Sequence, residues 1–342
     1  MRTKLLFTAT IVALFFSACS NEDNSNEKNN VNLKNSYRQT SDNYNDVKKL
    51  QDNALEKITQ FFEFNTENPN VTLETENGVM INISTSSLTI QGQRVHGNIV
   101  VEYVEIFKRS TMATANKTTM GIADEQSDEI EGVDLWPLKT GGEFFVNMTF
   151  NNQQIDDGAN ITLTVPTALT GGNDPNMTAW DGEINNGGDV VWDEDDDAEP
   201  VGGGGDQGGT GGENYNLDVD NFGWSNIDRF WGYAGPKTTI RVDVPAGYDN
   251  NNSNVYLATE GEQNMLARLD TYDAGTELFS EHYGQVPVGL SGYIVFVSGT
   301  IGQWDYTIKP VTFTPNDIIV IDAVDIVTGT QTDVENAIDA IP

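Results

Sequence analysis

Short apolar segments with a period of two residues recur along most of this chain, and this pattern limits its fold more than any other feature. The clearest examples are Val79, Ile81 and Ile83; Ile99, Val101 and Tyr103; Phe144, Val146 and Met148; and Ile161, Leu163 and Val165. Successive side chains of a β-strand point to opposite faces, so this period indicates strands with a buried face. Turn residues separate the segments, and no long helical period competes with them. The sequence therefore predicts a mainly β fold of antiparallel, sandwich-like layers.

An acidic, glycine-rich stretch divides the chain. Residues 193–214 contain eight glycines and eight acidic residues, a composition that favours a flexible, self-repelling linker. We therefore expect two antiparallel β-sandwich-like domains, an N-terminal one over 46–192 and a C-terminal one over 215–342. Short helices are expected near both ends, because apolar residues follow helical spacing in 47–58 and 334–341. Thr332 and Glu335 form a capping-box pattern before the second helix.

The first 18 residues have the pattern of an export signal. Arg2 and Lys4 precede a mostly apolar run over 5–16, which is too short to span a bilayer, and Ser17 and Ala18 follow it. Cys19 is the one cysteine of the chain, and its setting resembles the lipobox of bacterial lipoproteins, in which such a cysteine is acylated and begins the mature protein. The alternative is an ordinary secretory signal with a cysteine beside its cleavage site.

The residues after Cys19 predict a disordered tether and a signal for export to the cell surface. Residues 20–45 are rich in Asn and Ser and poor in apolar side chains, so 19–45 is expected to be a lipid anchor with a disordered tether. Ser20, Asn21, Glu22 and Asp23 resemble the acidic export signal that sends Bacteroidetes lipoproteins to the outer face of the outer membrane. The predicted location is therefore the outer membrane, lipid-anchored and facing the cell exterior.

The charge of the chain excludes some partners. With 52 acidic and 18 basic residues, its formal net charge is −34. Binding to nucleic acid or to an anionic lipid surface needs clustered Lys and Arg that replace counterions. We therefore expect no nucleic-acid partner, and membrane attachment through the lipid.

Several stretches resemble a module of surface lipoproteins and large cell-surface proteins of Bacteroidetes, especially flavobacteria. They are VEIFKR (104–109), NKTTMG (116–121), GGEFFVN (141–147), VPTALTGG (165–172) and, in the second half, FGWSNIDRF (222–230). The resemblance implies a β-rich fold and an outer-membrane lipoprotein. It implies no enzymatic activity.

The residue types needed for catalysis are sparse or uninformative here. The two histidines, His96 and His282, lie in different predicted domains, which argues against a Ser-His-Asp or His-rich metal site. Glu102 and Glu105 interrupt an apolar strand, and we expect them to be edge-facing or hydrogen-bonded carboxylates near Lys108 or Arg109. We therefore predict no catalytic residue, and a hydrolase with a carboxylate pair remains the competing class.

Calcium is the ion that the oxygen ligands of this chain suit best. The run 193–197 has aspartates at alternate positions like an EF-hand loop, but Ala198 stands where that loop needs glycine. Residues 208–213 resemble a single calcium β-roll repeat, which cannot stack on a second copy. Ca²⁺ is thus a candidate cofactor of the linker, and a solvated charge run is the simpler interpretation.

The densest aromatic cluster follows residue 222 and predicts either a core or a contact surface. We expect Trp224 and Phe230 to lie in the core. Asp228 and Arg229, next to these aromatic residues, suggest an internal ion pair. Gly232 and Gly235 suggest that Trp231 and Tyr233 lie on a turn, and these two aromatic residues are candidate contacts to a ligand or partner.

The sequence therefore favours a non-catalytic surface lipoprotein that acts as a binding or accessory module. Its partner would be another outer-membrane protein or an extracellular glycan. An inert structural spacer and the hydrolase are the other classes.

Overall fold

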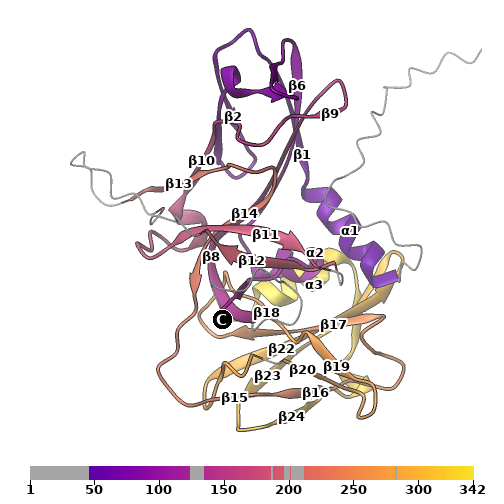
Figure 1. The fold of residues 1–342 in the computed structure, drawn as a ribbon. Helices are drawn as coiled ribbons and strands as arrows, with labels where there is room; N and C mark the ends of the chain where they lie inside the picture. Colours follow the sequence, from indigo (N-terminus) through magenta and orange to yellow (C-terminus); the bar gives the residue numbers. More distant parts are fainter. Residues whose placement is uncertain (1–45, 124–134, 186–187, 196–200, 202–211, 282) are drawn as a thin grey trace, which may run out of the picture. The chain divides into compact units, whose positions relative to one another are not determined.

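The structure is a computed structural model, which describes residues 46–123, 135–185, 188–195, 201, 212–281 and 283–342 (Figure 1). The described part is mainly β, as predicted, with strands from Gln60 to Gly329 and three α-helices. The predicted signal (1–18) and tether (19–45), with Cys19 and the export tract, lie outside the described residues, as does most of the linker. No helix in the described ranges is long and apolar enough to cross a membrane.

The largest sheet has eight strands and closes partly on itself. Its order is β1 (Gln60–Asn65), β6 (Asn98–Ile106), β8 (Leu135–Phe150), β14 (Gly223–Phe230), β11 (Thr178–Ile184), β12 (Val190–Glu194) and β7 (Met120–Ile122), with β9 (Gln153–Gln154) beside β8. Strand β7 also pairs with β8, so β8, β14, β11, β12 and β7 form a small five-stranded barrel. The closing pair of β12 with β7, at Trp192 and Gly121, is parallel.

A second sheet covers one face of the first. Its order is β13 (Asn214–Asp218), β10 (Ile161–Pro166), β3 (Met80–Ser84) and β2 (Asn70–Glu74), and β4 (Thr89–Ile90) pairs with β5 (Gln93–Arg94) nearby in sequence. Alternate apolar residues of these strands and of β6 and β8 form one buried cluster that includes Ile81, Leu163, Val101 and Val146. The alternation of apolar residues in the sequence therefore corresponds to the strand positions that face this core.

The remaining strands build two more sheets with their own core. One has the order β18 (Ala267–Arg268), β17 (Ser253–Thr259), β22 (Ser291–Thr300), β23 (Gln303–Thr312) and β25 (Val327–Gly329). The other has the order β19 (Thr271–Asp273), β20 (Leu278–Ser280), β16 (Arg241–Asp243) and β24 (Ile318–Val320), and β15 (Lys237–Thr238) pairs with β21 (Val286–Pro287). Val242, Leu257, Phe279 and Phe296 belong to the core that the two sheets share.

The three helices pack in a third cluster. Helix α1 (Asp46–Ile58) and helix α3 (Gln331–Asp339) occur near the ends where helical spacing predicts them, and α2 (Arg109–Ala115) lies between β6 and β7. Leu50, Met112, Ile338 and the barrel residue Trp192 belong to one buried cluster. The capping box of α3 is formed by Thr330 and Asp333 and not by Thr332 and Glu335, because the helix begins two residues earlier than the spacing indicates.

The sheets of the first half include strands that come after the predicted linker in the sequence. Strands β13 and β14 come after residue 212, yet β13 pairs with β10, and β14 pairs with β8 and β11. Strand pairing over such distances in sequence leaves no local periodic signal.

Candidate functional site

Trp231 and Tyr233 lie together on the segment that leaves β14. Their rings are stacked, with centroids 6.2 Å apart and planes 22° from parallel, and both side chains are half-buried. The backbone N–H of Trp231 donates to the carbonyl of Pro137 in β8, which fixes the start of the segment to the sheet. The structure thus places two partly exposed, stacked aromatic rings next to β8.

A second aromatic group lies next to them in sequence. Phe230 is half-buried and packs edge-on against Trp180 and Trp136, with ring centroids 5.1 and 6.0 Å away. Trp224 is 5 % exposed and belongs to the buried cluster of the barrel. The Lys237 ammonium lies 5.4 Å from the Trp136 ring centroid, within reach of a cation–π interaction.

The expected ion pair between Asp228 and Arg229 is wrong. Arg229 instead donates to the carboxylate of Asp174 at 2.6 Å, while Asp228 is fully buried. Successive residues of a strand point to opposite faces, so two neighbours in β14 cannot pair with each other.

Asp228 shares the barrel with a second buried acid, Glu143. Both are 0 % exposed, and neither carboxyl has a hydrogen-bond partner of good geometry among the described residues. Burial raises the pKa of both groups well above the usual range, and Asp228 raises the pKa of Glu143 further. The two acids therefore lose their protons at a higher pH than exposed carboxyl groups do.

Glu102 and Glu105 are buried, hydrogen-bonded carboxylates, as the sequence suggests, but Glu105 is not held by Lys108 or Arg109. Its carboxylate accepts hydrogen bonds from the side chains of Gln60, Thr75, Asn77 and Tyr103 and from the backbone N–H of Asn77. The Asn147 amide lies 3.5 Å from the Glu102 carboxylate.

The two cations next to Glu105 in sequence have other roles. Lys108 pairs with Asp339 at 3.6 Å. Arg109 is 0 % exposed, and its guanidinium donates to the backbone carbonyls of Thr259, Glu262 and Ile341. Arg109 therefore ties α2 to the chain before β18 and after α3.

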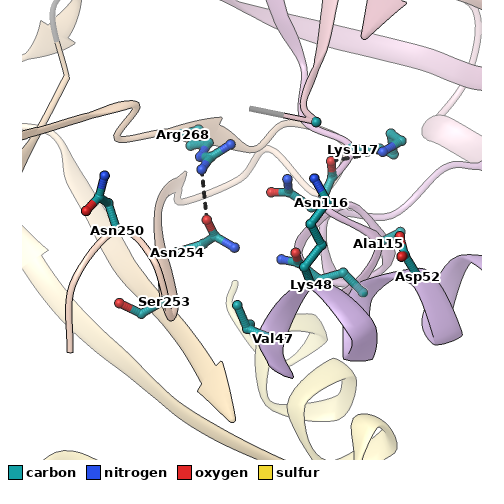
Figure 2. A pocket seen from close by; sticks show the side chains of 12 residues that line it. Val47, Lys48, Asp52, Ala115, Asn116, Lys117, Asn250, Ser253, Asn254 and Arg268 are labelled. Carbon is teal, nitrogen blue, oxygen red and sulfur yellow. Dashed lines mark hydrogen bonds between the residues drawn. The ribbon is translucent and has the colours of Figure 1, made fainter. Parts of the chain in front are cut away.

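A polar cavity of about 70 Å³ opens between α1, the end of α2 and β17 (Figure 2). Most of its lining side chains are polar or charged, and three of them are cations. The lining residues are Val47, Lys48, Gln51, Asp52, Ala115, Asn116, Lys117, Gly188, Asn250, Ser253, Asn254 and Arg268. We call this site the polar pocket.

Hydrogen bonds hold two walls of the polar pocket. Asn116 is the left-handed residue that ends α2, and its side chain accepts from the Tyr256 hydroxyl at 2.7 Å and donates to Asp189. Asp189 also pairs with Arg268, whose guanidinium donates to the side-chain amide oxygen of Asn254 at 2.9 Å. The position of the Arg268 charge is therefore fixed.

Lys117 is a buried cation of the polar pocket whose pKa is strongly lowered. Only 5 % of Lys117 is exposed. Its ammonium donates to the backbone carbonyl of Asn116 at 3.4 Å and lies 5.6 Å from the Trp224 ring centroid. Burial lowers the pKa of Lys117 to about 8. Burial also lowers the pKa of Arg268 to about 10.

The candidate metal ligands of the sequence do not form a site in the described part. Within those residues, no group of three or more His, Cys, Asp or Glu is placed to hold a metal ion. Asp193 and Asp195 are described, and together with Asp220 they raise the pKa of Asp181, after burial, the main cause. The rest of the calcium candidates, 196–197 and 208–211, and His282 lie outside the described residues, while His96 is exposed.

Comparison with known proteins adds no relative: no protein-family model matches the chain, and no curated protein matches it. The resemblance to surface lipoproteins therefore stays a prediction. Sequence reasoning also missed the polar pocket, since Lys48, Lys117 and Arg268 are far apart in the chain.

Proposed function

We propose that this chain is a non-catalytic binding or accessory module, held by a lipid on Cys19 to the outer face of a bacterial outer membrane. The basic and apolar residues before Cys19 and the acidic residues Glu22 and Asp23 after it support this location. In this proposal the strands form two sandwich-like domains, and the acidic, glycine-rich residues lie between β12 and β13.

The observation that carries the binding role is the stacked pair of Trp231 and Tyr233. Large aromatic rings gain much contact area for little lost rotamer freedom, which is why they dominate the energy of many interfaces. Both rings are partly exposed and their segment is fixed to β8. They therefore suit a contact with another outer-membrane protein, and the aromatic ring faces also suit an extracellular glycan.

The hydrolase alternative is less well supported by the same geometry. A carboxylate pair must reach its substrate in an accessible pocket. Glu143 and Asp228, the two acids that interact inside the barrel, are both 0 % exposed. Their burial suits a structural role better than a catalytic one.

Co-purification tests the binding role. Native protein extracted from membranes in mild detergent should retain a partner, and Trp231→Ala with Tyr233→Ala should lose it. Phe61→Ala is the matched control, because Phe61 is an aromatic residue that is 56 % exposed on β1, away from this segment in sequence. Recovery of the native protein without a partner in every mild detergent would contradict an accessory subunit.

Titration with soluble polysaccharides separates the glycan alternative. Binding of a sugar ring against Trp231 should change the tryptophan fluorescence, and Trp231→Ala should remove that change. A glycan response that survives the substitution would move the contact to another surface.

The anchor is tested separately. Cys19→Ala should release the chain from membranes, and continued membrane association would contradict lipidation at this residue. Neutral replacement of 20–23 should leave the protein in the outer membrane but facing the periplasm. Unchanged protease accessibility on whole cells would argue against the export signal.

A further inference from the structure

We propose that the polar pocket binds a small oxyanion, such as a carboxylate or phosphate group carried on a larger ligand. The inference concerns α1, the end of α2 and β17, and it does not depend on the Trp231–Tyr233 contact. Three observations carry it: the charge of the lining, an unpartnered donor, and the size of the cavity.

The lining is cationic in a strongly acidic chain. Lys48, Lys117 and Arg268 are three of the 18 basic residues of the chain, and Asp52 is the one acid among the residues that line the cavity. Asp189, just behind the lining, pairs with Arg268. Asp270 also interacts electrostatically with Arg268, so these two acids offset the charge of Arg268. Lys48 and Lys117 face only Asp52 among the lining residues, which favours an anionic ligand.

Asn254 supplies an unpartnered donor. The residue is 6 % exposed. Its side-chain oxygen accepts a hydrogen bond from Arg268 at 2.9 Å, which fixes the orientation of the side-chain amide. Its amide nitrogen has no hydrogen-bond partner within the described ranges. Figure 2 shows this nitrogen on the side that faces Lys48 and Asn116, away from Arg268. An N–H₂ group that lines the cavity and donates to no described residue favours a ligand that accepts hydrogen bonds.

The size of the cavity selects a small group. Its volume of about 70 Å³ is far below the roughly 300 Å³ at which pockets for whole drug-sized ligands begin. It suits the head group of a ligand whose remainder lies in solvent. An oxyanion can accept from the Asn254 amide and from a cation at once, because each of its oxygens has free lone pairs.

Thermal unfolding of the purified full chain tests the site with inorganic phosphate, sulfate and acetate as probes, each against sodium chloride of equal ionic strength. A ligand that binds the native state raises the melting temperature with a concentration dependence that gives the dissociation constant. Stabilisation by phosphate and sulfate assigns a tetrahedral group to the site, and stabilisation by acetate assigns a carboxylate. No stabilisation by any of the three probes would overturn the proposal.

A matched pair of lysines on α1 locates the binding. Lys48→Ala should weaken binding of the effective probe about tenfold, as expected for the loss of a charged hydrogen bond. Lys57→Ala removes the same charge from the same helix, but Lys57 is exposed and does not line the pocket. Equal weakening in the two variants would mean that the probe responds to net charge and not to the pocket.

Asn254→Asp provides a second variant that keeps the shape of the site. The new carboxylate still accepts from Arg268 but puts an acceptor in place of the donor. Binding of the probe should fall by about tenfold or more, because two acceptors then face each other. Unchanged affinity in a folded variant would remove Asn254 from the site and contradict the assigned pocket.

Discussion

Lys117→Met should change how the stability of the protein depends on pH. Lys117 is almost fully buried, and methionine has a similar length without the charge. Desolvation is the largest influence on the pKa of Lys117; Lys48 and Arg268 also lower it, while Asp52 and Glu143 raise it. The net effect places the pKa of the folded state at about 8, below the ordinary lysine value of 10.5.

The size and sign of the effect follow from proton linkage. Between pH 8 and 10.5 the unfolded chain holds a proton at Lys117 that the folded chain has lost, so this group makes stability rise with pH across that window. The interval of about 2.5 pH units corresponds to about 3 kcal/mol at 1.36 kcal/mol per unit. Below pH 8 the wild type carries the full cost of the buried charge, and the variant should be the more stable protein.

Urea unfolding of the two proteins at pH 7, 8, 9 and 10 measures this effect. The free energy of unfolding of the wild type minus that of Lys117→Met should increase by about 3 kcal/mol toward high pH. Ionisation of tyrosines in the unfolded chain acts on both proteins and cancels in the difference. A difference that stays constant over this range would show that Lys117 titrates near its ordinary value and would refute the argument from burial.

Four further substitutions test the barrel, the hydrogen bonds of Glu105 and the contacts by which Arg109 ties α2 to the rest of the chain. Glu143→Gln should raise the free energy of unfolding at pH 7 and give no gain near pH 4, because the raised pKa of Glu143 makes folding take up a proton at neutral pH. Glu105→Gln should instead lower the free energy of unfolding by about 2 kcal/mol at pH 7, since the Glu105 carboxylate accepts several hydrogen bonds. Chemical denaturation at pH 7 and pH 4 measures both variants. Equal changes in the free energy of unfolding for the two variants at pH 7 would contradict the different roles given to Glu143 and Glu105. Gly182→Ala should cost roughly 1–3 kcal/mol in the same assay, because a Cβ there would lie 2.5 Å from the Trp192 ring; a neutral result would mean that the barrel repacks. Arg109→Lys should cost about 2 kcal/mol in thermal or urea unfolding, since one ammonium cannot reach three carbonyls, and unchanged stability would argue against these contacts.

Local periodicity predicts the local elements of this protein well. The alternation at Ile81, Leu163 and Val101 is that of buried strand positions, and helical spacing indicates α1 and α3. Helix α2 escapes prediction because its seven residues, RSTMATA, are too few to show a period. Its end at Asn116, in the left-handed conformation, is also set by contacts with Tyr256 and Asp189 that are distant in sequence.

The barrel and the polar pocket could not be predicted for a related reason. The barrel closes through a three-residue strand and a parallel pairing between Gly121 and Trp192, which no local pattern encodes. The pocket brings Lys48 and Lys117 beside Arg268, residues that lie on three separate elements. Trp231 and Tyr233 were accessible to sequence reasoning because glycines next to them indicate a turn.

Lys117 connects the two features that the sequence does not show. Its ammonium lies near the Trp224 ring of the barrel, and the residue also lines the polar pocket. Within the described ranges no salt bridge joins Lys117 to a carboxylate, although Asp52 and Glu143 act on it electrostatically. Its buried charge therefore destabilises the fold, and an apolar side chain of equal length would pack better. Residues that break the rules of packing in this way are expected where a site needs them. The proposed oxyanion accounts for this charge, because a bound anion would stabilise the protonated lysine that burial disfavours.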